Sequence, residues 1–119
     1  MTTIDEKMLP LATKVLEESN SKAKEDSHQI DPMTILTIIS LLIKLATFLW
    51  EWYRRDKDKF VKSNQLNFIM RWVVWRHVKK DVVNRKDAKY IYEGICGMVY
   101  KFTDDDRKTL IEVITEKGK

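Results

Sequence analysis

The chain has 119 residues, of which 44% are hydrophobic, and a formal net charge of +4. This length fits one domain with one core. Three glycines and two prolines supply little turn chemistry for hairpins, and no strand pattern competes, so composition excludes a β-rich class. We predict an all-α fold, a single small bundle of about four to five helices with one long central apolar helix.

The first 31 residues are predicted to form an acidic helix and a polar linker, and residues 32–119 the helical bundle. Pro10 is expected to begin the first helix, because a proline at the first helical position has no N–H to lose. The polar stretch 19–29 is typical of a linker or a frayed helix end.

Asp31 and Pro32 predict the start of a second helix that continues to about Arg55. Its apolar part, 33–50, would rise about 27 Å, close to the roughly 30 Å of a bilayer core. Its polar residues recur every three or four positions and form one narrow stripe: Thr34, Thr37, Ser40, Lys44, Thr47, Glu51, Arg54 and Asp58. Such a stripe is typical of a bundle helix with one edge in water. We therefore favour a bundle, and a membrane-anchored or holin-like protein that spans through 33–53 is an alternative.

Two further helices are predicted from their N-cap residues. Ser63 and Asn64 offer the cap of the third helix, and Asn84 with Asp87 resembles a capping arrangement for the fourth. The fourth helix has the most regular apolar spacing in the chain, which predicts a core face of Ala88, Ile91, Tyr92, Ile95, Cys96, Val99 and Phe102.

Three consecutive carboxylates, Asp104, Asp105 and Asp106, follow Thr103 at the start of a fifth helix. They complement the positive end of the helix dipole, and no calcium-loop spacing surrounds them, so we prefer a capping role to a metal site. The residues expected to point into the core from this helix are Leu110, Ile111 and Ile114.

Two glycines, Gly94 and Gly97, lie on the fourth helix three residues apart. Such small residues let a second helix approach closely, which is a better explanation here than a nucleic-acid clamp. Cys96 between them is expected to be buried and cannot form an internal disulfide. Because the first residues also lack a secretory signal, we expect a cytoplasmic protein.

The two histidines give no indication of catalysis. His28 lies in the polar linker and His77 in a basic helix end that is expected to be solvated, and neither has a zinc-like partner spacing. We therefore expect a protein that is not an enzyme, with no catalytic residue, metal, cofactor or small-molecule substrate.

Positive charge concentrates in residues 54–89, which hold twelve Lys and Arg against four Asp. Within this segment bases alternate with tryptophans, and Lys or Arg can neutralise phosphates while an exposed indole stacks on a base. This pattern predicts a nucleic-acid-binding module as one alternative. We favour the other interpretation, in which Trp72 and Trp75 belong to the core. The candidate nucleic-acid contacts are Arg71, Arg76, Lys79, Lys80, Arg85, Lys86 and Lys89.

Aromatic side chains also indicate a candidate surface for binding protein partners. The segments 33–53 and 66–75 are apolar on more sides than a short bundle can easily cover, and uncovered apolar patches usually mark contact surfaces. Our leading hypothesis is a non-enzymatic interaction or structural protein that self-associates or binds a larger partner. Its candidate surface consists of Trp50, Trp52, Tyr53, Trp72 and Trp75.

Residues 9–50 resemble small uncharacterised proteins of tailed bacteriophages. The likeness rests on the acidic helix that starts at Leu9 and Pro10, followed by Asp31, Pro32 and the Ile/Leu run. The resemblance implies a virion or infection-accessory protein in the host cytoplasm, and it implies no catalytic residues.

Overall fold

The structure is a computed structural model that describes residues 4–55, 64–81, 84–99 and 101–117. Within these ranges, side chains are described except at 4–5, 48–55, 64–67, 69–70, 81, 99, 114 and 117. The described chain forms α1 (Ile4–Glu25), α2 (Thr34–Arg55), α3 (Asn64–Asp81), α4 (Arg85–Val99) and α5 (Asp104–Lys117). No strand occurs among the described residues, so the all-α class is confirmed there.

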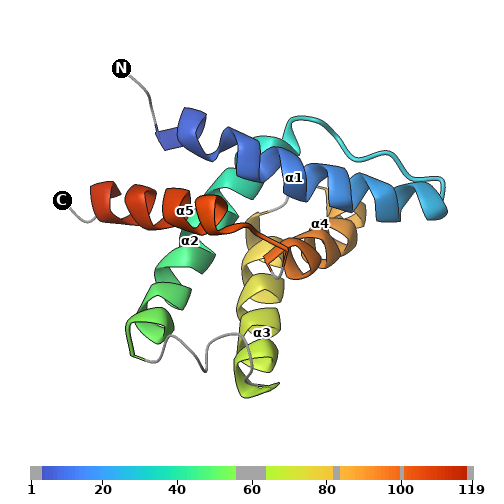
Figure 1. Cartoon of the computed structure of the whole chain (residues 1–119). Coiled ribbons are helices and arrows are strands. Elements are labelled where there is room, and N and C mark those ends of the chain that lie inside the picture. The colour runs from blue at the N-terminus through green and yellow to red at the C-terminus, as the bar shows by residue number, and fades with distance from the viewer. Residues whose placement is uncertain (1–3, 56–63, 82–83, 100, 118–119) are drawn as a thin grey trace.

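The helices form an upper layer and two arms, as Figure 1 shows. In the upper layer α1 runs across the molecule, with α5 beside it and α4 behind its C-terminal half. The arms are α2 and α3, which extend away from that layer next to one another. In the described residues α1 contacts α2, α4 and α5, whereas α3 contacts α2 and α4.

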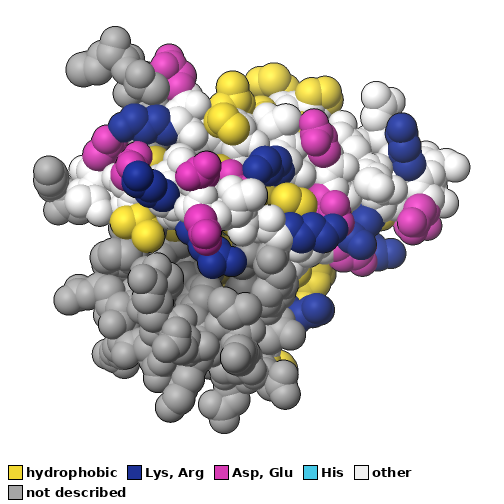
Figure 2. Space-filling model, viewed as in Figure 1, with side chains coloured by type: hydrophobic (Ala, Val, Ile, Leu, Met, Phe, Trp, Pro, Cys, Tyr) yellow, Lys and Arg dark blue, Asp and Glu magenta, His cyan; other side chains and the backbone are white. Residues whose placement is uncertain are grey.

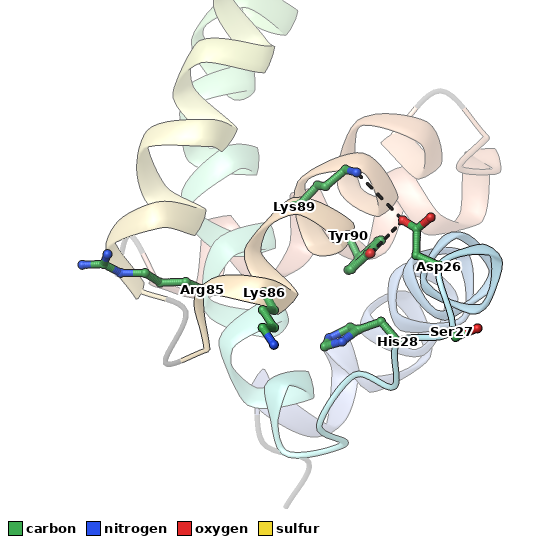
Figure 3. A pocket seen from close by; sticks show the side chains of 7 residues that line it. All are labelled: Asp26, Ser27, His28, Arg85, Lys86, Lys89 and Tyr90. Carbon is green, nitrogen blue, oxygen red and sulfur yellow. Dashed lines mark hydrogen bonds and ion pairs between the residues drawn. The ribbon is translucent and has the colours of Figure 1, made fainter.

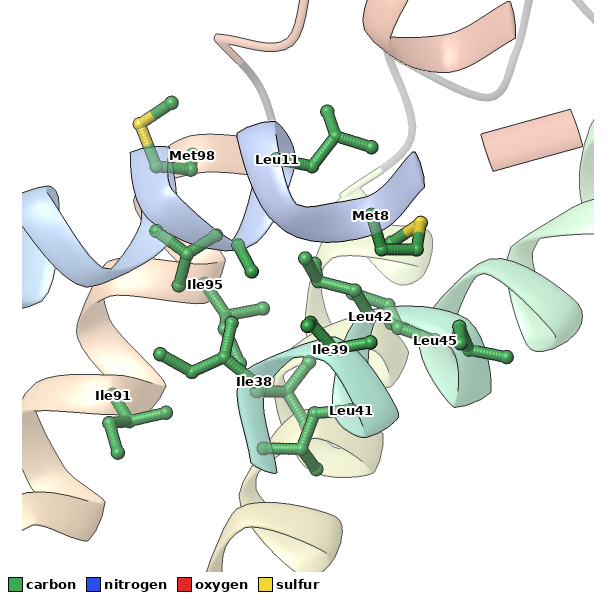
Figure 4. Close-up of a cluster of buried hydrophobic side chains, with 14 of the residues drawn as sticks. Met8, Leu11, Ile38, Ile39, Leu41, Leu42, Leu45, Ile91, Ile95 and Met98 are labelled. Atoms are coloured by element: carbon green, nitrogen blue, oxygen red, sulfur yellow. The ribbon is translucent and has the colours of Figure 1, made fainter. Parts of the chain in front are cut away.

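The core lies where α1, α2 and α4 meet (Figure 4), because each of these helices carries an apolar stripe toward the same point. Leu42 of α2 is 1% exposed, as expected for a residue away from the polar stripe. The predicted face of α4 is confirmed at Ala88, Ile91, Ile95 and Cys96, whereas Tyr92 is half-buried and the side chain of Val99 lies outside the described residues. Phe102 is buried as well, but it follows the end of α4. The largest fully buried apolar side chains are Met8, Leu11, Ile38, Leu42, Ile91, Ile95, Val15, Val78 and Val113.

The structure does not show one long central apolar helix. Helices α1 and α2 have 22 residues each, and the buried side chains of α1 belong to the same core as those of α2. The polar stripe of α2 is exposed at Ser40, Lys44 and Thr47, but Thr34 is buried against the preceding turn. Among the described residues, no helix combines the length and the apolar character that crossing a membrane requires.

The predicted ends of α1 are wrong on both sides. Pro10 lies inside the helix, and residues that we expected in a linker continue the helix to Glu25. The reason is tertiary packing, since Ser19 and Ala23 are completely buried although their sequence neighbourhood is polar. Burial against other helices stabilises helical turns that their own propensities would leave frayed.

Helix α5 begins with the capping arrangement predicted from its sequence. The backbone N–H of Asp106 donates to Oγ1 of Thr103 at 3.1 Å, and the N–H of Thr103 donates back to Oδ2 of Asp106 at 3.0 Å. Lys14 of α1 donates to the same carboxylate oxygen at 2.8 Å. Further along α5, Val113 is the fully buried residue, whereas Leu110 and Ile111 are half-buried and the side chain of Ile114 lies outside the described residues.

The charge of Asp106 is expected to stabilise the fold in a pH-dependent way. Desolvation acts to raise the pKa of Asp106, but the hydrogen bonds from Lys14 and Thr103 outweigh it and lower this pKa below its ordinary 3.8. A carboxyl group with a lowered pKa in the folded state stabilises the protein above its unfolded-state pKa, and this contribution disappears as the pH falls through the folded-state pKa.

We therefore expect Asp106→Asn to lower the free energy of unfolding by up to about 1 kcal/mol at pH 7, because solvent screens the Lys14 side chain, which is 41% exposed. The difference from wild type should begin to shrink at about pH 4 and should close as the pH falls through the lowered folded-state pKa of Asp106. Urea unfolding of wild type and variant, at pH 7 and at acidic pH, measures this difference in free energy. Asp105→Asn is the matched control, since Asp105 shares the first turn, and its side chain has no hydrogen bond or ion pair to a described residue. If Asp105→Asn lowered the free energy of unfolding as much as Asp106→Asn, the interaction with the helix dipole alone would explain both losses.

Candidate functional site

Helix α3 has one face in the core and one face in solvent. Val74 and Val78 are 4% and 0% exposed and fasten α3 to the core. On the other side, Phe68, Trp72 and Trp75 are 73%, 55% and 44% exposed. The interpretation of Trp72 and Trp75 as core residues is therefore wrong, because the short valines occupy the core face and leave the bulky rings outside.

The exposed rings are arranged along a single line on α3. Spacings of four and three residues, from 68 to 72 to 75, repeat close to the 3.6-residue turn of a helix. Arg76 places its guanidinium carbon 5.5 Å from the centre of the Trp72 ring, a cation–π contact. Trp75 meets Tyr92 of α4 edge-on, with ring centres 5.3 Å apart and planes at 82°. These contacts restrict both indoles while leaving large parts of them open to solvent.

Positive charges flank these rings. The side chains of Arg71, Arg76, Lys79 and Lys80 are exposed on α3, and the only acid in the sequence of this helix is Asp81 at its end. We use "the α3 face" for Phe68, Trp72, Trp75 and these four cations.

The surface over α1 and α5 looks different, because Lys and Arg alternate there with Asp and Glu (Figure 2). Ion pairs join the two helices across it, including Lys14 with Asp106 and Lys7 with Glu116. Charge of a single sign therefore distinguishes the α3 face from this mixed surface.

The structure divides the seven predicted basic contacts into two groups. Four belong to the α3 face. The other three, Arg85, Lys86 and Lys89, lie on the first turns of α4 and line a cavity of about 540 Å³ together with Asp26, Ser27, His28 and Tyr90. In Figure 3 Arg85 extends away from the other labelled side chains, and Lys89 points toward Asp26. Of the predicted aromatic surface, Trp72 and Trp75 are exposed, whereas the side chains of Trp50, Trp52 and Tyr53 lie outside the described residues.

A buried acid–histidine pair lies beside this cavity, and no spacing in the sequence indicates it, because its two residues are 59 positions apart. Asp87 is 0% exposed, and its Oδ1 lies 2.5 Å from Nε2 of His28. Its Oδ2 accepts the N–H of Asp31 at 3.4 Å. We call this pair the His28–Asp87 clasp, because it fastens the connection between α1 and α2 to the first turn of α4.

The clasp corrects the prediction for Asp87. This residue was expected to complete the cap of α4, but the cap is made by Asn84, whose Oδ1 accepts the N–H of Lys86 at 2.9 Å. His28 lies in the connection between α1 and α2, as expected, and its ring stacks on Tyr90 with centres 5.2 Å apart and planes at 20°. A second bond, from the Tyr90 hydroxyl to Asp26 at 2.8 Å, ties the end of α1 to α4 and raises the pKa of Tyr90.

The backbone at the end of α1 explains how His28 reaches Asp87. Ser27 has a φ of 55°, and its N–H donates to the carbonyl of Lys24 at 3.1 Å. The N–H of His28 donates to the carbonyl of Ala23 at 2.9 Å. These two bonds form a Schellman turn, which usually has glycine at the left-handed position. Because a serine occupies that position, no glycine marks the turn in the sequence as the end of a helix.

The remaining reactive groups do not form a second site among the described residues. Burial raises the pKa of the Cys96 thiol more than Arg71 and a hydrogen bond to Tyr92 lower it, so this cysteine is kept as a buried thiol. No group of three or more His, Cys, Asp or Glu side chains in the described ranges could hold a metal ion.

The fold and its surface together define a small all-α protein with one basic, aromatic helix face. No protein-family model matches this chain, and neither a curated protein nor a solved structure matches it.

Proposed function

We propose that this chain is a non-enzymatic binding protein that holds nucleic acid on the α3 face. The observation that carries the proposal is the exposure of Phe68, Trp72 and Trp75 on one line between cations. Packing does not require these rings, because α3 is already anchored by Val74 and Val78 on its other side. Large exposed aromatic groups usually mark a surface that binds something.

The positive charge of the α3 face supports a polyanion as its binding partner. The α3 face carries four exposed cations, and no acid other than Asp81 occurs in the sequence of α3. Lys and Arg that neutralise phosphates release the counterions condensed on the nucleic acid, which makes binding strong at low salt. Arg85 and Lys86 carry further positive charge on the first turn of α4, the next helix in the chain.

The salt dependence of binding tests this proposal. We expect Arg76→Ala and Lys79→Ala each to weaken binding of a random-sequence oligonucleotide and to flatten the slope of log K against log salt by about 0.7 to 0.9, one phosphate contact each. Fluorescence anisotropy at several salt concentrations measures both quantities. Lys108→Ala is the control, because Lys108 is an exposed lysine on α5, outside the α3 face. Lack of binding at low salt, or an unchanged slope in both variants, would contradict the proposal.

Binding of a protein partner is the second candidate function. Three exposed apolar side chains outside the α3 face favour it: Leu9 is 46% exposed, Met33 68% and Leu36 56%. Met33 and Leu36 are three residues apart, so they share one side of the chain at the start of α2. A virion or infection-accessory protein in a host cytoplasm, the setting that the phage resemblance implies, would be compatible with either partner. A protein that binds no oligonucleotide but shows a dimer mass by light scattering would put this candidate first.

A further inference from the structure

We infer that the nucleic acid on the α3 face is single-stranded, and that its bases stack on the exposed rings of Trp72 and its neighbours. This inference rests on the proposed function and adds the form of the ligand. The α3 face offers two kinds of contact, cations for phosphates and aromatic faces for bases. A single strand is the form of nucleic acid that can use both at once, because each of its bases can turn a π face outward.

The spacing of the rings suits a strand that runs along the helix. At 1.5 Å per residue, Phe68 and Trp72 are separated by about 6 Å along the axis of α3, and Trp72 and Trp75 by about 4.5 Å. Tyr92 and Arg76 already restrict the two indoles, so less freedom is lost when a base stacks on them. The three rings therefore form a short stacking platform beside the cations.

A duplex would leave this platform unused. Its bases are stacked inside the helix, so the rings of the α3 face would meet backbone and groove edges, and only the cations would contribute. A second copy of this chain is also a poor occupant, because two α3 faces would bring Arg71, Arg76, Lys79 and Lys80 against the same four cations. An interfacial membrane helix separates its cations from its aromatic face, whereas here Arg76 lies over the Trp72 ring itself.

The test compares one oligonucleotide as a single strand and as a duplex with its complement. We expect Trp72→Ala to weaken single-strand binding roughly tenfold and duplex binding less than about twofold, since only the single strand loses a base stacked on this ring. Lys79→Ala should weaken both to a similar extent. Trp72→Phe, which keeps a ring, should recover most of the single-strand affinity. Leu36→Ala is the control, because it removes an exposed apolar side chain from another helix. Unfolding curves confirm that each variant is folded.

The outcomes separate this inference from the proposed function. Equal binding of strand and duplex, with no effect of Trp72→Ala, would overturn the single-strand inference and leave nucleic-acid binding in place. Absence of binding to either form would overturn both. Binding to anionic lipid vesicles that depends on Trp72, without binding to either oligonucleotide, would also overturn both and make the α3 face a membrane-surface contact.

Discussion

Gly94→Ala is expected to lower the free energy of unfolding by about 2 kcal/mol, although alanine is the better helix former. A Cβ at position 94 would lie 1.9 Å from Oγ of Ser19, 3.0 Å from its Cβ and 3.0 Å from the backbone oxygen of Val15. Rotation of the serine hydroxyl relieves only the first of these contacts. Helix α1 must therefore move away from α4, and chemical denaturation should show the loss.

Gly97→Ala is the matched control, one turn further along the same helix. Its Cβ would come no closer than 3.5 Å to the side chain of Glu18, an ordinary contact. We expect this variant to be more stable than wild type by about 0.5 to 1 kcal/mol, because alanine loses less backbone entropy than glycine in a helix. Adding Ser19→Ala to Gly94→Ala should restore part of the lost stability. The diagnostic result is a loss of stability in Gly94→Ala together with a gain in Gly97→Ala. Changes of the same sign in both variants would contradict the close approach of α1 and α4.

His28→Ala is expected to lower the free energy of unfolding by about 3 kcal/mol, the lower end of the range for removing one partner of a buried acid–base pair. The variant leaves the carboxylate of Asp87, which is 0% exposed, without its closest partner. It also removes the ring that stacks on Tyr90. We expect a loss at the lower end of that energy range because the His28 side chain is itself 20% exposed, so water can reach part of the space that it leaves.

A double-mutant cycle, which compares the double variant with each single variant, separates the effect of the unpaired Asp87 carboxylate from that of lost packing. His28→Ala/Asp87→Ala should be about 1 kcal/mol more stable than His28→Ala alone, because the unpaired carboxylate is gone. His77 is half-buried, which corrects the prediction of a solvated side chain, and it has no ion pair with a described residue. His77→Ala is therefore the control, and we expect it to change the free energy of unfolding by less than about 1 kcal/mol. A double variant less stable than His28→Ala would show that Asp87 does not depend on His28, and the clasp would then be only a packing contact.

Local patterns in the sequence were sufficient for much of the fold. The capping pair of Thr103 and Asp106 depends on residues three positions apart, and the buried face of α4 follows from a spacing of three and four residues. Both are properties of a single helix, so neither depends on knowing which helix packs against which. The exposed edge of α2 at Lys44 follows from the same periodicity.

Contacts between distant segments required the tertiary structure. Which face of α3 would be buried could not be read from 68–78, where valines and aromatic residues surround the helix and each side is apolar enough to enter a core. Contact with α2 and α4 selects the valine side and leaves Trp72 outside.

The helical class, most helix starts, the buried stripes of α2 and α4 and the concentration of positive charge in 54–89 were all predictable from the sequence. The continuation of α1 through Ser19 to reach Gly94, and the contact of His28 with Asp87 across 59 positions, became visible in the folded molecule. Capping and periodicity act within one or two helical turns, whereas burial and the pairing of buried polar groups depend on which surfaces meet after the chain has folded.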